Sequence, residues 1–91
     1  MESRLQKNKQ ICYLCGKPMA GSEKHHCLNG LAYREKCEAD RLFCFVHPVC
    51  HQFIHNHPMT ARTLKQGSQR IYEAEIGTRE EFIKRYGKNY L

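Results

Sequence analysis

The sequence predicts a small α+β domain in which an antiparallel pair of short strands is followed by a helix and then by two further helices. Three observations support this prediction. The chain has only 91 residues, and a domain of this size buries so little surface that it often needs an added staple. It contains six cysteines and six histidines, several of them at the spacing of metal ligands. Its apolar residues form two strand-like segments and then three helix-like ones.

The N-terminal part is polar and leads into a cysteine turn. We expect residues 1–91 to form a single domain with three parts. These are a polar arm (1–10), a metal-bound core (11–58) and a helical extension (59–91). The arm should be frayed or form a short helical turn, because it has no apolar pattern. Cys12 and Cys15 follow in a CxxC turn ending at Gly16, which is typical of one half of a zinc knuckle. A redox-active CxxC would need a βαβ pattern around it, and the sequence lacks one.

Residues 23–28 are predicted to form the first strand, and two adjacent histidines lie within it. Asn29-Gly30 ends the segment and is a strong turn signal. Adjacent side chains on a strand point to opposite faces. We therefore expect different roles for His25 and His26: one can bind a metal while the other faces a substrate or a bound water.

Residues 41–46 are the strongest strand candidate in the chain. They are apolar and aromatic, and we expect them to pair antiparallel with residues 23–28. The charged segment 31–40 connects the two strands and is expected to contain at most a helical turn.

His47 and Cys50 have the spacing of a second knuckle half, and Pro48 between them makes the turn. Together with Cys12 and Cys15 they predict a Cys3His site for a structural Zn2+.

The remaining cysteines leave one alternative open. Cys44 has ligand spacing to His47 and competes for the metal, but Pro48 favours His47 with Cys50 and leaves Cys44 as a core thiol. Cys27 and Cys37 have no partner at ligand spacing and are expected to be buried. A disulfide framework would be typical of a secreted domain, but the first nine residues lack the apolar core of a signal peptide.

The first predicted helix carries a second pair of histidines. It begins at Pro48, since proline suits the first turn, and it ends at Asn56 before His57-Pro58. His51 and His55 stand at i and i+4, so their imidazoles share one face and can bind a second metal.

Two further helices are expected after residue 59. The second begins with Thr60 as its cap and ends near Glu75, and the third follows a capping box from Thr78 to Glu81. Their inward-facing side chains are predicted to be Leu64, Ile71, Tyr72, Phe82, Ile83 and Tyr86.

The net charge of +6 lies mainly outside the core. Residues 1–10 carry three basic and one acidic side chain, residues 11–59 five and four, and residues 60–91 seven and four. This excess suits a polyanionic partner such as nucleic acid. No run approaches the roughly 20 apolar residues of a membrane span, so we expect a soluble, cytoplasmic protein. The residues expected to contact phosphates, without reading base sequence, are Arg34, Arg62, Lys65 and Arg70.

This order of features resembles an HNH endonuclease of the ββα-metal class, in a small phage-type form with a structural zinc. The order is a half knuckle, a strand with His25-His26, a second strand, a second half knuckle, and a helix with His51 and His55. The resemblance covers about residues 10–58. It implies a metal-dependent enzyme that hydrolyses phosphodiester bonds of DNA, in a bacterial host cell if the protein is phage-encoded.

The resemblance also implies the role of each histidine. His25 corresponds to the metal ligand on the first strand, and His26 to the general base that activates water. His51, directly after the last zinc ligand, and His55 complete the site of one catalytic cation. Such an all-imidazole site favours Zn2+, Ni2+ or Mn2+ over Mg2+, although family members commonly use Mg2+ or Mn2+.

The chain departs from the family pattern at two places. His47 stands where the family has a cysteine, which still gives a sound zinc site. The central asparagine, which buttresses the base histidine, has no clear counterpart: Asn29 comes too early, and Asp40 or Glu38 lie nearer the expected place. The alternative function is a non-catalytic, zinc-stabilised nucleic-acid-binding module of phage origin. The C-terminal helices could support a homo-oligomer, but the sequence does not indicate one.

Overall fold

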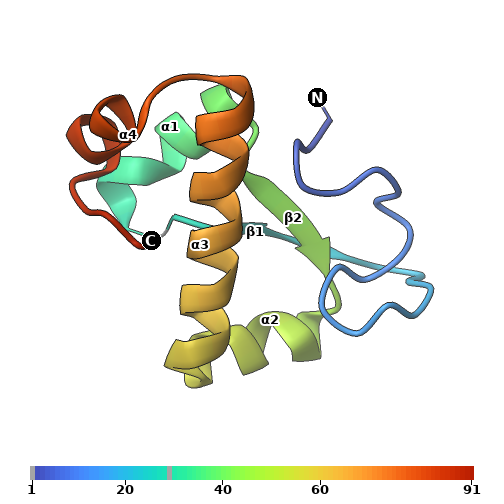
Figure 1. Cartoon of the computed structure of the whole chain (residues 1–91). Helices are drawn as coiled ribbons and strands as arrows, with labels where there is room; N and C mark the ends of the chain where they lie inside the picture. Colours follow the sequence, from blue (N-terminus) through green and yellow to red (C-terminus); the bar gives the residue numbers. More distant parts are fainter. Residues whose placement is uncertain (1, 29) are drawn as a thin grey trace.

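A two-stranded sheet lies at the centre of the molecule (Figure 1). In the computed structural model, which describes residues 2–28 and 30–91 and their side chains except that of Leu31, β1 (Glu23–His26) pairs antiparallel with β2 (Phe43–Val46). The register places His25 opposite Cys44. The predicted pairing is confirmed, with shorter strands than expected. Of the predicted Asn29-Gly30 turn, Asn29 lies outside the described residues.

The two strands are connected by α1 (Leu31–Asp40), a ten-residue helix where the sequence suggested at most a turn. This helix has neither a side-chain cap nor a proline in its first turn, so the local sequence gave no clear helix signal. Contacts with β1 and with the last helix hold it in place. The carboxylate of Asp40 accepts hydrogen bonds from Arg85 Nε and from the Tyr86 hydroxyl, both at 2.6 Å, and Lys36 Nζ donates to the Arg85 carbonyl at 2.9 Å.

Three helices follow β2. α2 (Pro48–Asn56) has the predicted bounds. α3 (Pro58–Glu75) starts earlier than predicted, because Pro58 occupies its first turn and His57 its N-cap; Thr60 is therefore not the cap. Figure 1 shows α3 running in front of the sheet, between α2 and the pair formed by α1 and α4. No helix in the described part of the chain is both long and apolar enough to cross a membrane.

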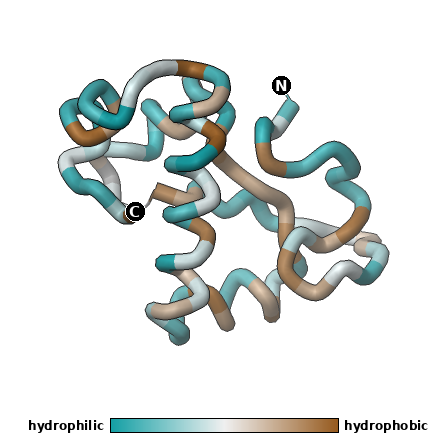
Figure 2. The backbone as a smooth tube through the Cα atoms, in the orientation of Figure 1, coloured by the Kyte–Doolittle hydropathy of each residue, from teal (hydrophilic) through white to brown (hydrophobic). Residues whose placement is uncertain are grey.

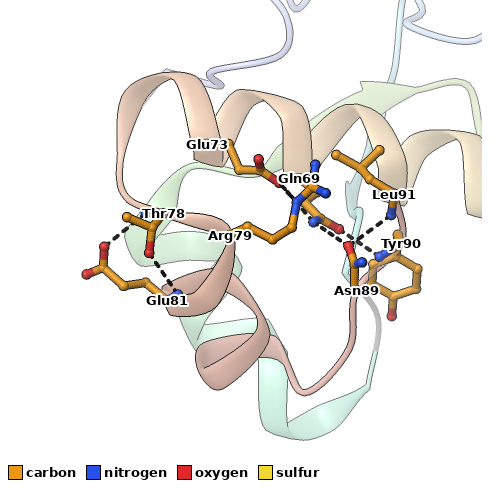
Figure 3. Close-up of polar contacts among 8 residues, drawn as sticks. All are labelled: Gln69, Glu73, Thr78, Arg79, Glu81, Asn89, Tyr90 and Leu91. Carbon is orange, nitrogen blue, oxygen red and sulfur yellow. Dashed lines mark hydrogen bonds and ion pairs between the residues drawn. The ribbon is translucent and has the colours of Figure 1, made fainter.

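The predicted capping box of α4 (Arg79–Tyr86) is confirmed. The Thr78 hydroxyl accepts a hydrogen bond from the Glu81 N–H at 3.1 Å, and the Glu81 carboxylate accepts one from the Thr78 N–H at 2.9 Å (Figure 3). Phe82 and Tyr86 are buried as predicted. The prediction for Ile83 was wrong: its side chain is 36% exposed, because the short helix buries only one narrow stripe.

The core has two parts, and residues at or next to β2 contribute to both. Figure 2 shows β2 as a hydrophobic stretch between more hydrophilic segments. One cluster lies toward α2 and the knuckle, and consists of Cys12, Cys27, Cys44, Val46, Ile54 and Leu64. The other lies toward α1 and α4, and consists of Leu28, Cys37, Leu42, Tyr72, Phe82 and Tyr86. The helices after residue 59 thus complete both parts of the core.

The segment after α4 is held against α3 by a buried glutamine (Figure 3). Gln69 is fully buried, and its Oε1 accepts a hydrogen bond from the Tyr90 N–H at 2.7 Å. Its Nε2 donates to Asn89 Oδ1 at 2.8 Å and to a Glu73 carboxylate oxygen at 2.9 Å. Since every polar atom of this amide has a partner, its burial carries no desolvation penalty from an unpaired group.

Over residues 2–10 the polar arm is neither frayed nor helical. The Arg4 N–H donates to the Arg41 carbonyl at 2.9 Å, and the Ser3 hydroxyl donates to the Phe43 carbonyl. Gln6 Oε1 accepts from the Phe45 N–H at 2.7 Å. These contacts cover the outer edge of β2 and leave β1 as the open edge of the sheet.

Candidate metal centres and the histidine cavity

The four predicted zinc ligands come together in space. The ligand atoms of Cys12, Cys15, His47 and Cys50 all lie within 4.8 Å of one another. His47 Nδ1 lies 3.4 Å from Cys15 Sγ and 4.0 Å from Cys50 Sγ. Its Nε2 lies 3.2 Å from the Pro18 carbonyl and donates to it, so that Nδ1 carries the free lone pair. Tetrahedral ligands around Zn2+ lie about 3.3–3.8 Å apart, so the cluster is consistent with a structural zinc.

The electrostatics of this cluster favour a bound cation. Burial opposes ionisation of Cys12, but hydrogen bonds from the backbone N–H groups of Cys15, His47 and Leu14 outweigh it and lower the pKa of this thiol to about 6. Burial and the neighbouring thiols of Cys12 and Cys15 raise the pKa of Cys50 to about 11. A cation among the four would offset this repulsion and allow the remaining thiols to ionise.

Cys44 lies outside the knuckle. It is fully buried, with its sulfur 3.9 Å from that of Cys27, and it does not belong to the cluster of four ligands. Cys27 and Cys37 are also buried, as expected. The structure therefore groups His47, and not Cys44, with the other three candidate ligands.

The second candidate metal centre consists of His25, His51 and His55. One β-strand and one helix bring their ring nitrogens within 4.8 Å of one another. The ring centroids of His51 and His55 are 4.8 Å apart, as expected for i and i+4 on α2, and that of His25 lies 5.3 Å from His51. Three imidazoles at this separation form a group able to bind one metal ion.

A carboxylate that the sequence reasoning missed orients His51. Glu23 Oε1 lies 2.8 Å from His51 Nδ1, so this nitrogen donates to the carboxylate and leaves Nε2 free for a cation. A carboxylate behind a metal-binding histidine fixes its tautomer and raises its basicity. Glu23 and His25 stand two residues apart on β1, on the same face. This spacing was the signal that could have identified Glu23.

The opposite face of β1 presents His26 to α1. Its Nε2 lies 3.2 Å from Glu38 Oε1, and Lys24 Nζ donates to the two oxygens of the same carboxylate at 2.9 and 3.3 Å. The hydrogen bond from Lys24, and then that from His26, lowers the pKa of Glu38 despite its partial burial. An ionised Glu38 holds the proton on Nε2 of His26, and the lone pair is therefore on Nδ1.

His25 is held neutral by its surroundings. Its side chain is only 4% exposed, and this burial lowers its pKa to about 4, with further contributions from the positive charges of His51, His55, His26 and Lys65. A neutral imidazole offers a lone pair to a cation across the physiological pH range.

This shift predicts a pH-dependent stability that depends on His25. Its pKa rises from about 4 in the folded protein to about 6.5 in the unfolded chain. The unfolded state therefore binds more protons between these values, and stability is lost as the pH falls. At pH 5 the loss should reach about 2 kcal/mol relative to pH 7. Urea unfolding of wild type and His25→Gln at both pH values measures it. Because both proteins keep the knuckle, an equal pH dependence in the variant would contradict the prediction.

The imidazoles border two adjoining cavities. The first, of about 370 Å³, is lined by Lys24, Gly30, Arg34 and all four histidines of this region. The second, of about 220 Å³, shares the wall formed by His25 and His55 and contains Lys65. The predicted phosphate contacts Arg34 and Lys65 thus lie at the histidine site.

The other two predicted phosphate contacts are placed differently. Arg62 is near enough to Lys65 to lower its pKa, after the larger effects of burial and of Lys88. Arg70 is exposed on α3 but lines neither cavity. It lies five residues beyond Lys65, which is about 140° around the helix, so it faces another direction.

The chain matches no protein-family model, and comparisons with curated proteins and with solved structures find no match. The arrangement established by its own residues is a small α+β domain, with a strand pair and a Cys/His cluster able to bind a metal.

Proposed function

We propose that the protein is a metal-dependent DNA endonuclease. One observation carries this proposal: three histidines able to bind a cation and a fourth histidine oriented by a carboxylate border the same open cavity. A module that only binds nucleic acid needs the zinc knuckle for its fold. It has no need of the four histidines that border the first cavity.

The residues of the cavity can divide the work of phosphodiester hydrolysis. Nδ1 of His26 would accept a proton from the attacking water, while Glu38 stabilises the imidazolium that forms. The water oxygen would form the new bond to phosphorus as the bond to the leaving oxygen breaks, and the leaving oxygen would take a proton from solvent water. Arg34, which lines the cavity, would bind a non-bridging oxygen of the phosphate. The trio His25, His51 and His55 would hold a divalent cation. This cation would offset the negative charge that builds up on the phosphate.

The test is cleavage of supercoiled plasmid with one added cation at a time, Mg2+, Mn2+, Ni2+ or Zn2+. Wild type should convert the plasmid to open circles or linear DNA with at least one of them. His51→Ala should reduce the rate about 100-fold or more, because it removes a proposed ligand of the cation. Omitting the cation is a better control than adding a chelator, since a chelator would also remove zinc from the knuckle.

A matched control is His57→Ala. His57 stacks on Phe53 with 3.6 Å between ring centroids and lies outside the trio, so its loss should leave cleavage unchanged. Equal cleavage by His51→Ala and wild type would exclude the proposed centre. DNA binding with no cleavage under any cation would instead support the non-catalytic binding module.

A further inference from the structure

The second cavity has a different chemical character from the first. Its walls include Ile54, Pro58 and Ala61, and Lys65 supplies its cationic side chain. It meets the first cavity at His25 and His55. A chain-like ligand bound at the histidine trio could therefore continue directly into it.

Lys65 is a partly buried cation without a carboxylate partner. Among the ion pairs of the described residues, none includes Lys65, Arg62 or Lys88. Burial lowers the pKa of Lys65, and the positive charges of Lys88 and Arg62 lower it further. Lys65 lines the cavity, and Lys88 and Arg62 lie near it. An anion bound at Lys65 relieves the mutual repulsion of the three cations.

The C-terminal segment holds part of this cluster in place. Lys65 Nζ and Lys88 Nζ each lie 5.6 Å from the ring centroid of Tyr90. Tyr90 is fixed to α3, because its N–H donates to Gln69 Oε1 (Figure 3) and its carbonyl accepts from Gln66 Nε2 at 3.0 Å. The cations are thus positioned by the folded structure.

We propose that this second cavity binds the phosphate adjacent to the scissile one in a DNA strand, with Lys65 as its main contact and Arg62 and Lys88 beyond it. The inference rests on the proposed function, since it defines the substrate as a polynucleotide that spans two neighbouring phosphates. An isolated phosphodiester would occupy the histidine cavity alone.

Two measurements test the subsite, with Lys84→Gln as the matched control because Lys84 is an exposed lysine that lines neither cavity. The first is binding of a fluorescent DNA duplex without added divalent cation. Lys65→Gln should weaken binding about tenfold and reduce the slope of log K against log salt by about 1. Lys65→Arg should retain most of the affinity.

The second measurement compares two substrates. Lys65→Gln should lower kcat/KM about tenfold on a DNA oligonucleotide and leave it unchanged on bis(p-nitrophenyl) phosphate, which has a single phosphorus. Equal DNA binding by Lys65→Gln and Lys84→Gln would overturn the subsite, as would an equal loss on both substrates. If wild type cleaves neither substrate but Lys65→Gln still weakens binding, the endonuclease proposal falls, and the second cavity stands only as a site for a DNA backbone phosphate.

Discussion

Replacing Cys12 with serine is expected to abolish cooperative unfolding of the whole domain. Structural zinc contributes roughly 10–16 kcal/mol of apparent binding free energy in small zinc domains, as much as or more than the 5–15 kcal/mol by which typical proteins are stable. The Cys12 sulfur accepts backbone hydrogen bonds from Cys15 and His47, both at 3.5 Å, and is 1% exposed. A serine hydroxyl is a poor zinc ligand, so the site would be lost. Thermal circular dichroism and the zinc content of the purified protein measure both effects.

Cys37→Ser is the matched control. Cys37 is equally buried, its thiol donates to the Leu28 carbonyl at 3.4 Å, and it lies outside the knuckle. This variant should keep its zinc and melt cooperatively. A Cys12→Ser protein that retained zinc and a cooperative transition would exclude the knuckle. Loss of zinc in Cys44→Ser but not in His47→Ala would assign the fourth ligand to Cys44.

Replacing His26 with alanine is expected to lower the DNA cleavage rate by about 10²–10⁴-fold, the usual contribution of a general base. DNA affinity should change little, because His26 is not one of the cationic side chains proposed to bind phosphate. Single-turnover cleavage of a labelled duplex with excess enzyme isolates the chemical step from product release. The dissociation constant of the same duplex, measured without added cation, provides the second readout.

The alanine variant must remain folded for this result to be informative. His26 is partly exposed and its ring contacts Phe43 edge-on, with centroids 6.3 Å apart, so a moderate loss of stability is expected and a thermal melt will show it. His57→Ala again serves as the control for loss of an imidazole. Cleavage at the wild-type rate by a folded His26→Ala protein would remove His26 as the base.

Local signals in the sequence were sufficient for helices whose ends are marked by a proline or by a capping box. Pro48 and Pro58 define the ends of α2, and Thr78 with Glu81 starts α4. α1 has neither mark. It is held by β1 and by α4, and the bonds from Asp40 to α4 join residues more than 40 apart in sequence. A pattern within residues 31–40 could not reveal it, because its stability is supplied by distant partners.

The candidate site was predictable to a similar extent. The spacing of His51 and His55, and that of Cys12 and Cys15, follows from local geometry, and the structure brings each pair together with its predicted partners. The contributions of Glu23 and Glu38 depend on which helix covers which face of β1. That arrangement is tertiary. Alternation along the strand could separate His25 from His26 and place Glu23 on the face of His25, but it could not show that Glu23 meets His51 or choose Glu38 over Asp40 as the partner of His26.

The link between Asp40 and α4 also has a consequence for the order in which the protein matures during translation. The chain emerges from the ribosome N-terminus first, and the knuckle ligands, both strands and all four histidines of the cavity precede residue 57. Arg85 and Tyr86 help to secure the helix that carries Glu38. They are synthesised about 30 residues after residue 57. A nascent chain can thus load its zinc before His26 acquires an oriented partner. If the protein is a nuclease, we expect this delay to keep it inactive until α3 and α4 have folded.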